Sequence, residues 1–382
     1  MLTSQSQSNV AATKTRRSGE TGLPLERGVR RIPHLPMPVI PPSLPIEKPA
    51  HLVWFGRFLI GALSVICQTL LVIWASLAVY WSNLPWPCAR LILAVVFMVG
   101  GIVCLGIVRT KRSFQIFALT SFGVLIWWGT IQPTHQREWK PEVSVLPRAV
   151  IDGDRVKLSG VRQFEYRSAT DFMPRYEERE VDLSHLQAVD LFVSYWKMGP
   201  VAHTFVSFDF DNAPPVCISI EARLEKGEIY SPLASCFKQA ELIYVVGDER
   251  DIVRLRTQYR NETVFLYRTR AKADGARKLF LSYLNKINQL ADEPEFYHLL
   301  SNNCTVNIDR HAQRNAKRSP FDFRLLLNGY VDGFAYAQGI LDASVPFPEL
   351  RQRSEITALA RAAASDVDFS RRIRENLPKP MP

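Results

Sequence analysis

The stretch HTFVSFDFDNAPPVCISIEAR, residues 203–223, decides the fold of the second half of this chain. Two runs of alternating side chains, 203–210 and 216–223, flank the turn-forming residues 211–215, and this pattern predicts an antiparallel hairpin. A register centred on Asn212 sets His203 directly across from Glu221, with Cβ atoms about 5 Å apart. A carboxylate in that place can accept a hydrogen bond from one imidazole nitrogen and leave the other free to act as a base.

Further strands and helices extend the hairpin. The segment VIDGDRVKL, residues 150–158, reads as strand, turn and strand, and the runs 192–196, 241–246 and 263–269 also have strand character. Leucines and isoleucines recur along one side of 273–290, which predicts a helix, and a second helix is expected over 304–314. The expected fold class is α+β, an antiparallel sheet with packed helices.

The second informative stretch is Asn302-Asn303-Cys304-Thr305. With Asn302 or Asn303 as the helix cap, Cys304 stands at a helix amino terminus, where unpaired N–H groups favour a thiolate and can stabilise an oxyanion. A thiol beside an imidazole can form a thiolate–imidazolium pair. Cys304, His203 and Glu221 are therefore the candidate catalytic residues. The candidate oxyanion or supporting groups are Asn302, Asn303, Ser219 and Arg223.

Each of these residues also has a structural interpretation. Cys304 can be a packed core thiol, His203 a satisfied core histidine, and Glu221 a partner of a nearby arginine. The arginines in question are Arg223 and Arg162, and the competing histidines are His185, His298 and His311. A Cys217–Cys236 disulfide beside a free Cys304 is a further alternative. No CxxC or His/Cys spacing indicates a metal site, and no cofactor or nucleotide motif is visible.

Three apolar runs, 58–80, 91–108 and 114–131, predict membrane-spanning helices that precede this domain. The short loop between the second and third contains Arg109, Lys111 and Arg112, and the amino-terminal segment is basic as well. The positive-inside rule then puts the amino terminus in the cytoplasm and everything after the third span outside. The net charge of +10 follows from these segments and from scattered arginines. No basic run interleaved with aromatics indicates a nucleic-acid site.

Several segments together resemble one protein family: YEEREVDLSHLQAVDLFVSYW, GPVAHTFVSFDF, ISIEAR, YRNETVFLYRTR and NNCT. They are similar to the extracytoplasmic domain of the Lnb-type lipoprotein N-acyltransferase family, over roughly residues 165–345. The resemblance implies a permuted papain-like thiol fold in which the histidine precedes the cysteine. It also implies that Cys304 is the nucleophile, His203 the general base and Glu221 the orienting residue. In the family the domain is amino-terminal, whereas here three spans come first.

The expected function is that of a membrane-anchored thiol acyltransferase. It would work through an acyl-cysteine intermediate on phospholipid or lipoprotein substrates at the outer face of the bacterial inner membrane. The alternatives are a membrane-tethered cysteine hydrolase of the cell envelope, acting as an amidase or peptidase, and a non-enzymatic envelope scaffold. The expected division of the chain is a disordered basic cytoplasmic arm (1–50), three spans (51–131), a linker with the first strands (132–164), the thiol domain (165–345) and a carboxy-terminal helix with a charged tail (346–382).

Overall fold

Three long helices form the first part of the described structure. The computed structural model describes residues 50–313, 322–325, 327–341 and 344–378, so the basic arm predicted for 1–50 lies almost entirely outside the described residues. The helices are α1 (Ala50–Tyr80), α2 (Pro87–Ile102), which continues as a π-helical segment (Val103–Val108), and α3 (Lys111–Thr130). All three are long and apolar enough to cross a membrane, as the sequence predicted.

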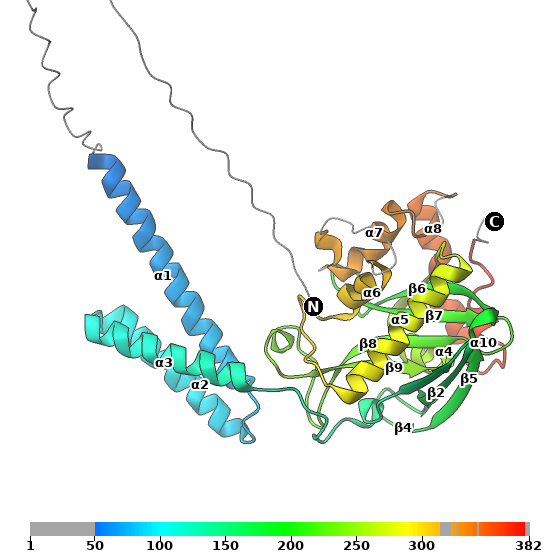
Figure 1. Ribbon diagram of the computed structural model, residues 1–382. Coiled ribbons are helices and arrows are strands. Elements are labelled where there is room, and N and C mark those ends of the chain that lie inside the picture. The colour runs from blue at the N-terminus through cyan, green and yellow to red at the C-terminus, as the bar shows by residue number, and fades with distance from the viewer. Residues whose placement is uncertain (1–49, 314–321, 326, 342–343, 379–382) are drawn as a thin grey trace, which may run out of the picture. The chain divides into compact units, whose positions relative to one another are not determined.

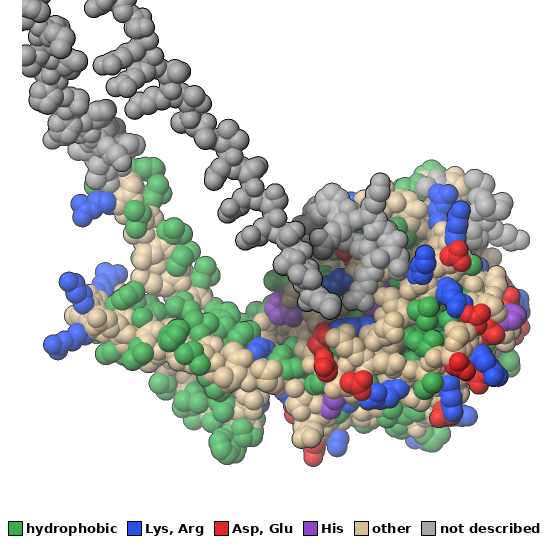
Figure 2. Space-filling model, in the orientation of Figure 1, with side chains coloured by type: hydrophobic (Ala, Val, Ile, Leu, Met, Phe, Trp, Pro, Cys, Tyr) green, Lys and Arg blue, Asp and Glu red, His purple; other side chains and the backbone are tan. Residues whose placement is uncertain are grey.

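The surfaces of these helices differ from the rest of the chain. Hydrophobic side chains cover them, with Lys and Arg near their ends, whereas the surface of the sheet domain carries many charges of both signs (Figure 2). Thr110 caps α3 by accepting a hydrogen bond from the backbone of Ser113, whose hydroxyl in turn accepts from the backbone of Thr110. This reciprocal cap starts α3 directly after the basic loop.

The remainder folds around an eight-stranded sheet with the order β1-β2-β9-β8-β7-β6-β10, and β5 pairs with β2. All neighbours are antiparallel except β2 and β9. The strands are β1 (Arg148–Asp152), β2 (Arg155–Arg162), β5 (Tyr176–Asp182), β6 (Leu186–Tyr195), β7 (His203–Phe210), β8 (Val216–Arg223), β9 (Glu241–Gly247) and β10 (Thr263–Arg268). A separate pair is formed by β3 (Glu165–Tyr166) and β4 (Phe172–Met173).

Helices cover both faces of the sheet (Figure 1). One face packs against α5 (Ala273–Asp292), α6 (Cys304–Gln313) and α7 (Val331–Ala337), and its core includes Val206 and Phe208. The other face packs against α4 (Glu249–Arg254), α9 (Thr357–Ala362) and α10 (Phe369–Arg372), and its core includes Phe205 and Cys217. Alternate residues of β7 thus serve two separate cores, as the period of a strand requires. The remaining α-helix of the described residues is α8 (Phe347–Ser354).

The predicted hairpin and its register are confirmed. Phe205 pairs with Ser219 and Phe208 with Val216, which is the register centred on Asn212. The fold class is also the predicted one, α+β with a mostly antiparallel sheet. The sequence did not reveal β5, because its charged, solvent-facing residues hide the strand pattern. The end of α6 predicted at Arg314 lies outside the described residues.

The structure shows two features that the sequence left open: the state of the cysteines and the attachment of the carboxy-terminal tail. Cys217 and Cys236 are free thiols, and the side chain of Cys217, a residue of β8, is fully buried. The charged tail is anchored to the domain: Arg374 forms ion pairs with Asp190 at 2.7 Å and with Glu249 at 2.5 Å. Both carboxylates are completely buried, and the positive charge of Arg374 compensates their negative charges. The charged tail therefore packs on the domain through this residue.

Candidate active site

The thiol of Cys304 lies at the first residue of α6 and is only 2% exposed. Asn303 caps the helix by accepting a hydrogen bond at Oδ1 from the backbone N–H of Val306, at 2.8 Å. Its own side-chain N–H donates to the carbonyl of Leu299, which fixes the loop before the helix. The helix begins where the sequence predicted, and the sulfur stands at its positive end.

His203 is the first residue of β7, at an end of the sheet where the strands separate. Backbone pairing between β7 and β8 ends at Phe205 and Ser219, although both strands continue. His203 belongs by parity to the face opposite the one that packs against α6. His203 is still paired with Ser194 of β6, and its imidazole is close enough to Cys304 to influence the ionisation of the thiol.

A relay of polar side chains extends from the imidazole. His203 Nε2 lies 2.8 Å from Ser219 Oγ, and Ser219 Oγ donates to Glu221 Oε1 at 2.8 Å. Arg256 donates to the same carboxylate oxygen at 2.9 Å. The sequence predicted direct contact between His203 and Glu221, but their closest atoms are 4.0 Å apart because the Ser219 hydroxyl stands between them.

This relay assigns the tautomer of the imidazole. A serine hydroxyl has one hydrogen, and that of Ser219 is donated to Glu221. Ser219 Oγ therefore accepts from His203, so Nε2 carries a proton and Nδ1 is left to interact with the thiol. The arrangement is that of an orienting group, an imidazole and a nucleophile in sequence.

The electrostatics favour charged forms of both ends of the relay. Burial raises the pKa of Cys304, but hydrogen bonding to His203, the charge of His203 and hydrogen bonds from Thr204 outweigh it and lower the pKa to about 6. Burial likewise raises the pKa of the Glu221 carboxyl, yet Arg256, followed by His203, holds it far below its usual range. The site can therefore hold the Cys304 thiolate at neutral pH together with the Glu221 carboxylate, and His203 and Ser219 stand between these two charges.

Other groups close around the sulfur. Thr305 Oγ1 lies 3.8 Å from Cys304 Sγ and 3.0 Å from Thr204 Oγ1. Asn328 donates from Nδ2 to the sulfur at 3.7 Å, and its Oδ1 accepts from the backbone N–H of Ala202 at 2.9 Å. The second bond fixes the amide so that its N–H faces the thiol. Asn328 is thus a hydrogen-bond donor aimed at the reactive atom.

Two tyrosines belong to the electrostatic surroundings of the thiol. Burial raises the pKa values of Tyr230 and Tyr297, and the negative charge of Cys304 contributes to both. The two rings meet edge to face, with centroids 6.4 Å apart, and Trp196 stacks on Tyr230 at 6.5 Å. Both phenols therefore remain protonated beside the thiolate.

Three of the predicted supporting residues have structural partners elsewhere. The side-chain N–H of Asn302 donates to the carbonyl of Phe296 at 2.8 Å, and that of Asn303 is used in the loop described above. Arg223 donates to the carbonyls of Val143 and Ser144 and packs over the ring of Trp139 at 4.2 Å. Arg223 therefore binds the linker after α3. The carboxylate of Glu221 pairs with Arg256 and not with Arg223.

The competing histidines are also accounted for. His185 Nδ1 lies 2.6 Å from Asp211 Oδ1, just beyond the other end of β7. His298 Nδ1 lies 2.9 Å from the Ser301 hydroxyl in a loop. His311 lies under α5, between Tyr244 and Ser282. Within the described residues, no group of three or more His, Cys, Asp or Glu side chains could hold a metal ion.

Sequence reasoning missed Arg256 and Asn328. Arg256 lies in a short π-helical segment (Leu255–Tyr259) where it is one of several arginines, and no fixed spacing links it to Glu221. Asn328 is the first residue of a short helical turn (Asn328–Tyr330) that packs against the segment before β7: Gly329 donates to the carbonyl of Pro200 at 3.0 Å. Both contacts depend on tertiary packing, so no local sequence signal could have found them.

Comparison with known proteins agrees with the resemblance seen in the sequence. Residues 172–329 match the family model of the Lnb N-terminal periplasmic domain. The match covers less than half of the chain, but it includes His203, Ser219, Glu221, Cys304 and Asn328. No curated protein and no solved structure matched the chain.

Proposed function

We propose that this chain is a membrane-anchored thiol acyltransferase that transfers an acyl chain between lipid or lipoprotein substrates at the outer face of the bacterial inner membrane. The observation that carries the proposal is the relay from Cys304 through His203 and Ser219 to Glu221, with the sulfur at the amino terminus of α6. This order, with the histidine before the cysteine, is the one expected of a permuted papain-like enzyme. A thiolate held in this way is suited to attack an acyl carbonyl.

In the first half-reaction, Cys304 Sγ attacks the carbonyl carbon of an ester in a phospholipid or lipoprotein diacylglyceryl group. The carbonyl oxygen becomes an oxyanion, which the N–H groups at the start of α6 and the amide of Asn328 can stabilise. The intermediate collapses, the carbon–oxygen bond breaks, and the departing alkoxide takes a proton from the imidazolium of His203. The acyl group is then held on sulfur as a thioester.

In the second half-reaction, a primary amine such as a lipoprotein amino terminus attacks the thioester. The amine loses a proton to His203 Nδ1, the carbon–sulfur bond breaks, and Cys304 leaves as a thiolate. The products over both steps are an amide and an alcohol from an ester and an amine. Ser219 and Glu221 hold the imidazole in one orientation through both steps.

The connection to the third apolar helix supports a substrate at the bilayer. α3 ends at Thr130, and the backbone N–H of Thr134 already donates to the buried carboxylate of Glu241. Four residues of extended chain span at most about 14 Å. The domain is therefore held close to the membrane, and Lys238, three residues before Glu241, donates to the carbonyl of Ile131 in this linker.

Apolar side chains on the loops around the thiol also support a lipid substrate over a polar peptide. Ile229, in the loop between β8 and β9 that carries Tyr230, is 82% exposed. Other exposed apolar residues of the loops next to the site are Trp196, Met198, Val201, Leu233 and Leu300. Apolar side chains gathered around one site are typical of a surface that contacts lipid or an apolar ligand.

The proposed orientation is amino terminus inside and sheet domain outside. Arg109 lies in the turn before α3, and Lys111 and Arg112 are the first two residues of α3. Short connections rich in Lys and Arg remain in the cytoplasm. The periplasmic description of the matching family supports the same orientation.

The test is mass spectrometry of lipoprotein amino termini from cells that carry the wild-type chain, Cys304→Ala or the control Cys236→Ala, which removes a different free thiol. We expect the amide-linked acyl chain with the wild type and with Cys236→Ala, and its loss with Cys304→Ala at equal protein abundance. Cleaved envelope peptides in place of acylated termini would indicate the hydrolase. Unchanged termini with Cys304→Ala would indicate the scaffold and refute thiol catalysis.

A further inference from the structure

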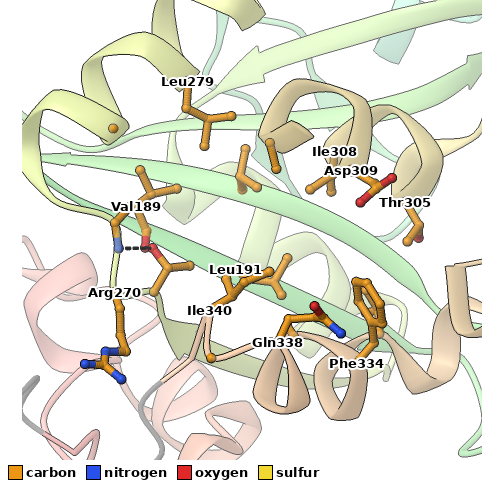
Figure 3. Close-up of a pocket in the computed structure, with 18 of the residues that line it drawn as sticks. Val189, Leu191, Arg270, Leu279, Thr305, Ile308, Asp309, Phe334, Gln338 and Ile340 are labelled. Atoms are coloured by element: carbon orange, nitrogen blue, oxygen red, sulfur yellow. Dashed lines mark hydrogen bonds between the residues drawn. The ribbon is translucent and has the colours of Figure 1, made fainter. Parts of the chain in front are cut away.

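A cavity of about 520 Å³ lies between the sheet and three helices (Figure 3). Its floor is formed by β6 and β7, and α5, α6 and α7 supply its walls. The lining is mainly aliphatic and aromatic, and includes Val189, Leu191, Val206, Leu279, Ile308 and Phe334. We call it the α5–α7 cavity. It lies on the sheet face that packs against α6, and the relay from His203 to Glu221 does not line it.

The cavity begins one residue away from the candidate nucleophile. Thr305 lines it, and the hydroxyl of Thr305 lies 3.8 Å from Cys304 Sγ. Figure 3 shows Thr305 at one end of the cavity and Val189, Leu279 and Arg270 toward the other end. Cys304 itself does not line the cavity, so a group attached to the sulfur has to pass Thr305 to enter it.

The size of the cavity fits a hydrocarbon chain. A methylene group is about the size of a water molecule, whose share of liquid volume is about 30 Å³, so about 520 Å³ corresponds to a chain of about seventeen carbons. Polar residues such as Arg270, Asp309 and Gln338 are outnumbered in the lining by apolar ones, so much of the wall offers water no hydrogen-bond partner. Its elongated course and apolar lining do not suit a peptide, whose backbone groups would be left without hydrogen bonds.

We propose that the α5–α7 cavity holds the hydrocarbon chain of the acyl group while its carbonyl carbon is bonded to Cys304. This inference rests on the proposed acyl transfer and adds the substrate class: a long acyl chain whose length the cavity limits. Burying the chain removes apolar surface from water and holds the thioester carbonyl beside the oxyanion donors.

Gly275 offers a substitution that shortens the cavity. It lines the cavity four residues before Leu279, and a Cβ atom added there would meet no other atom within 4 Å. Leucine in its place would extend into the cavity, and replacing a helical glycine does not weaken α5. Ala273→Leu is the matched control, because Ala273 is an exposed residue of the same helix and does not line the cavity.

The experiment uses the purified full chain in detergent micelles with p-nitrophenyl butyrate, octanoate, dodecanoate and hexadecanoate. Intact-protein mass spectrometry measures the rate at which each acyl group is added to Cys304. We expect Gly275→Leu to react with the butyrate as the wild type does and to lose at least about tenfold with the hexadecanoate, while Ala273→Leu keeps the wild-type profile. Equal chain-length profiles for Gly275→Leu and the wild type would overturn the proposal.

A second measurement separates the cavity from the chemistry. A photoreactive hexadecanoic acid is bound to Cys304→Ala, which cannot form a thioester, and the labelled peptides are identified. Labels on the segments that carry Leu279 and Phe334, reduced in the Cys304→Ala, Gly275→Leu double variant, would support the cavity even if no ester acylates the wild type. The absence of label there would overturn the acyl-chain site, whatever the outcome for Cys304.

Discussion

Removing the imidazole of His203 should abolish the thiolate of Cys304 at neutral pH. Burial by itself raises the pKa of this thiol, and contacts with His203 are the largest of the effects that lower it from its ordinary 9.0 to about 6. A difference of this size corresponds to about 4 kcal/mol in favour of the thiolate. His203→Ala should therefore return the pKa to 9 or above.

The consequence for reactivity follows from the fraction of thiolate. With a pKa of about 6, about nine tenths of the thiol is ionised at pH 7, whereas with a pKa of about 9 the fraction is about one hundredth. The rate of any step that uses the thiolate should fall by about two orders of magnitude from this cause alone. Loss of the general base would reduce turnover further.

The assay is the ultraviolet absorbance of the thiolate as a function of pH in the purified full chain. Spectra of Cys304→Ser, in the wild-type or His203→Ala background, are subtracted to remove the other five cysteines. We expect a midpoint near pH 6 for the wild type and near or above 9 for His203→Ala. His185→Ala, which alters a histidine at the other end of β7 that pairs with Asp211, is the control. A wild-type midpoint near 9, or an unchanged midpoint in His203→Ala with an intact fold, would refute the ion-pair reasoning.

Three further predictions address the oxyanion donor, the tail and the topology. Asn328→Leu should lower kcat by about 10²- to 10³-fold with little change in KM, whereas Leu327→Ala, at an exposed neighbour, should not; steady-state kinetics distinguish them, and equal kcat values would remove Asn328 from the site. Arg374→Met should cost about 3–5 kcal/mol of unfolding free energy at neutral pH, but Arg371→Met, at an exposed residue of α10, less than about 1 kcal/mol. Arg374 offsets the effect of burial and lowers the pKa of Glu249, so its stabilisation is lost as the pH falls through the folded-state pKa of Glu249; the deficit measured by urea unfolding should therefore shrink in acid, and a pH-independent deficit would contradict the pairing. A periplasm-dependent phosphatase fused after Trp139 should be active, and the same reporter fused in the loop at Arg109 should be silent; the reverse result would invert the proposed orientation.

The parts of the site that the sequence predicted are those fixed by local rules. The alternation of residues in β7 and β8 predicts the face of each side chain, a turn centred on Asn212 predicts the register, and an asparagine before Cys304 predicts the start of α6. The sequence did not place Ser219 between His203 and Glu221, because strand parity gives the face of a side chain but not how far it reaches. Arg256 and Asn328 reach the site only through packing of distant segments, which no single stretch of sequence encodes.

The proposed reaction requires that water is kept from the thioester, and both the burial of Cys304 and the membrane anchor serve this requirement. A thioester exposed to water is lost by hydrolysis, so a transferase must exclude water until the amine arrives. The sulfur is 2% exposed, so little water reaches it. The loops before β7 and after β8 carry the exposed apolar residues Met198 and Ile229, which suit contact with lipid better than contact with water. We therefore expect a version of the chain released from its helices to lose acyl transfer to lipoprotein amino termini, measured by mass spectrometry, even though its thiolate is intact.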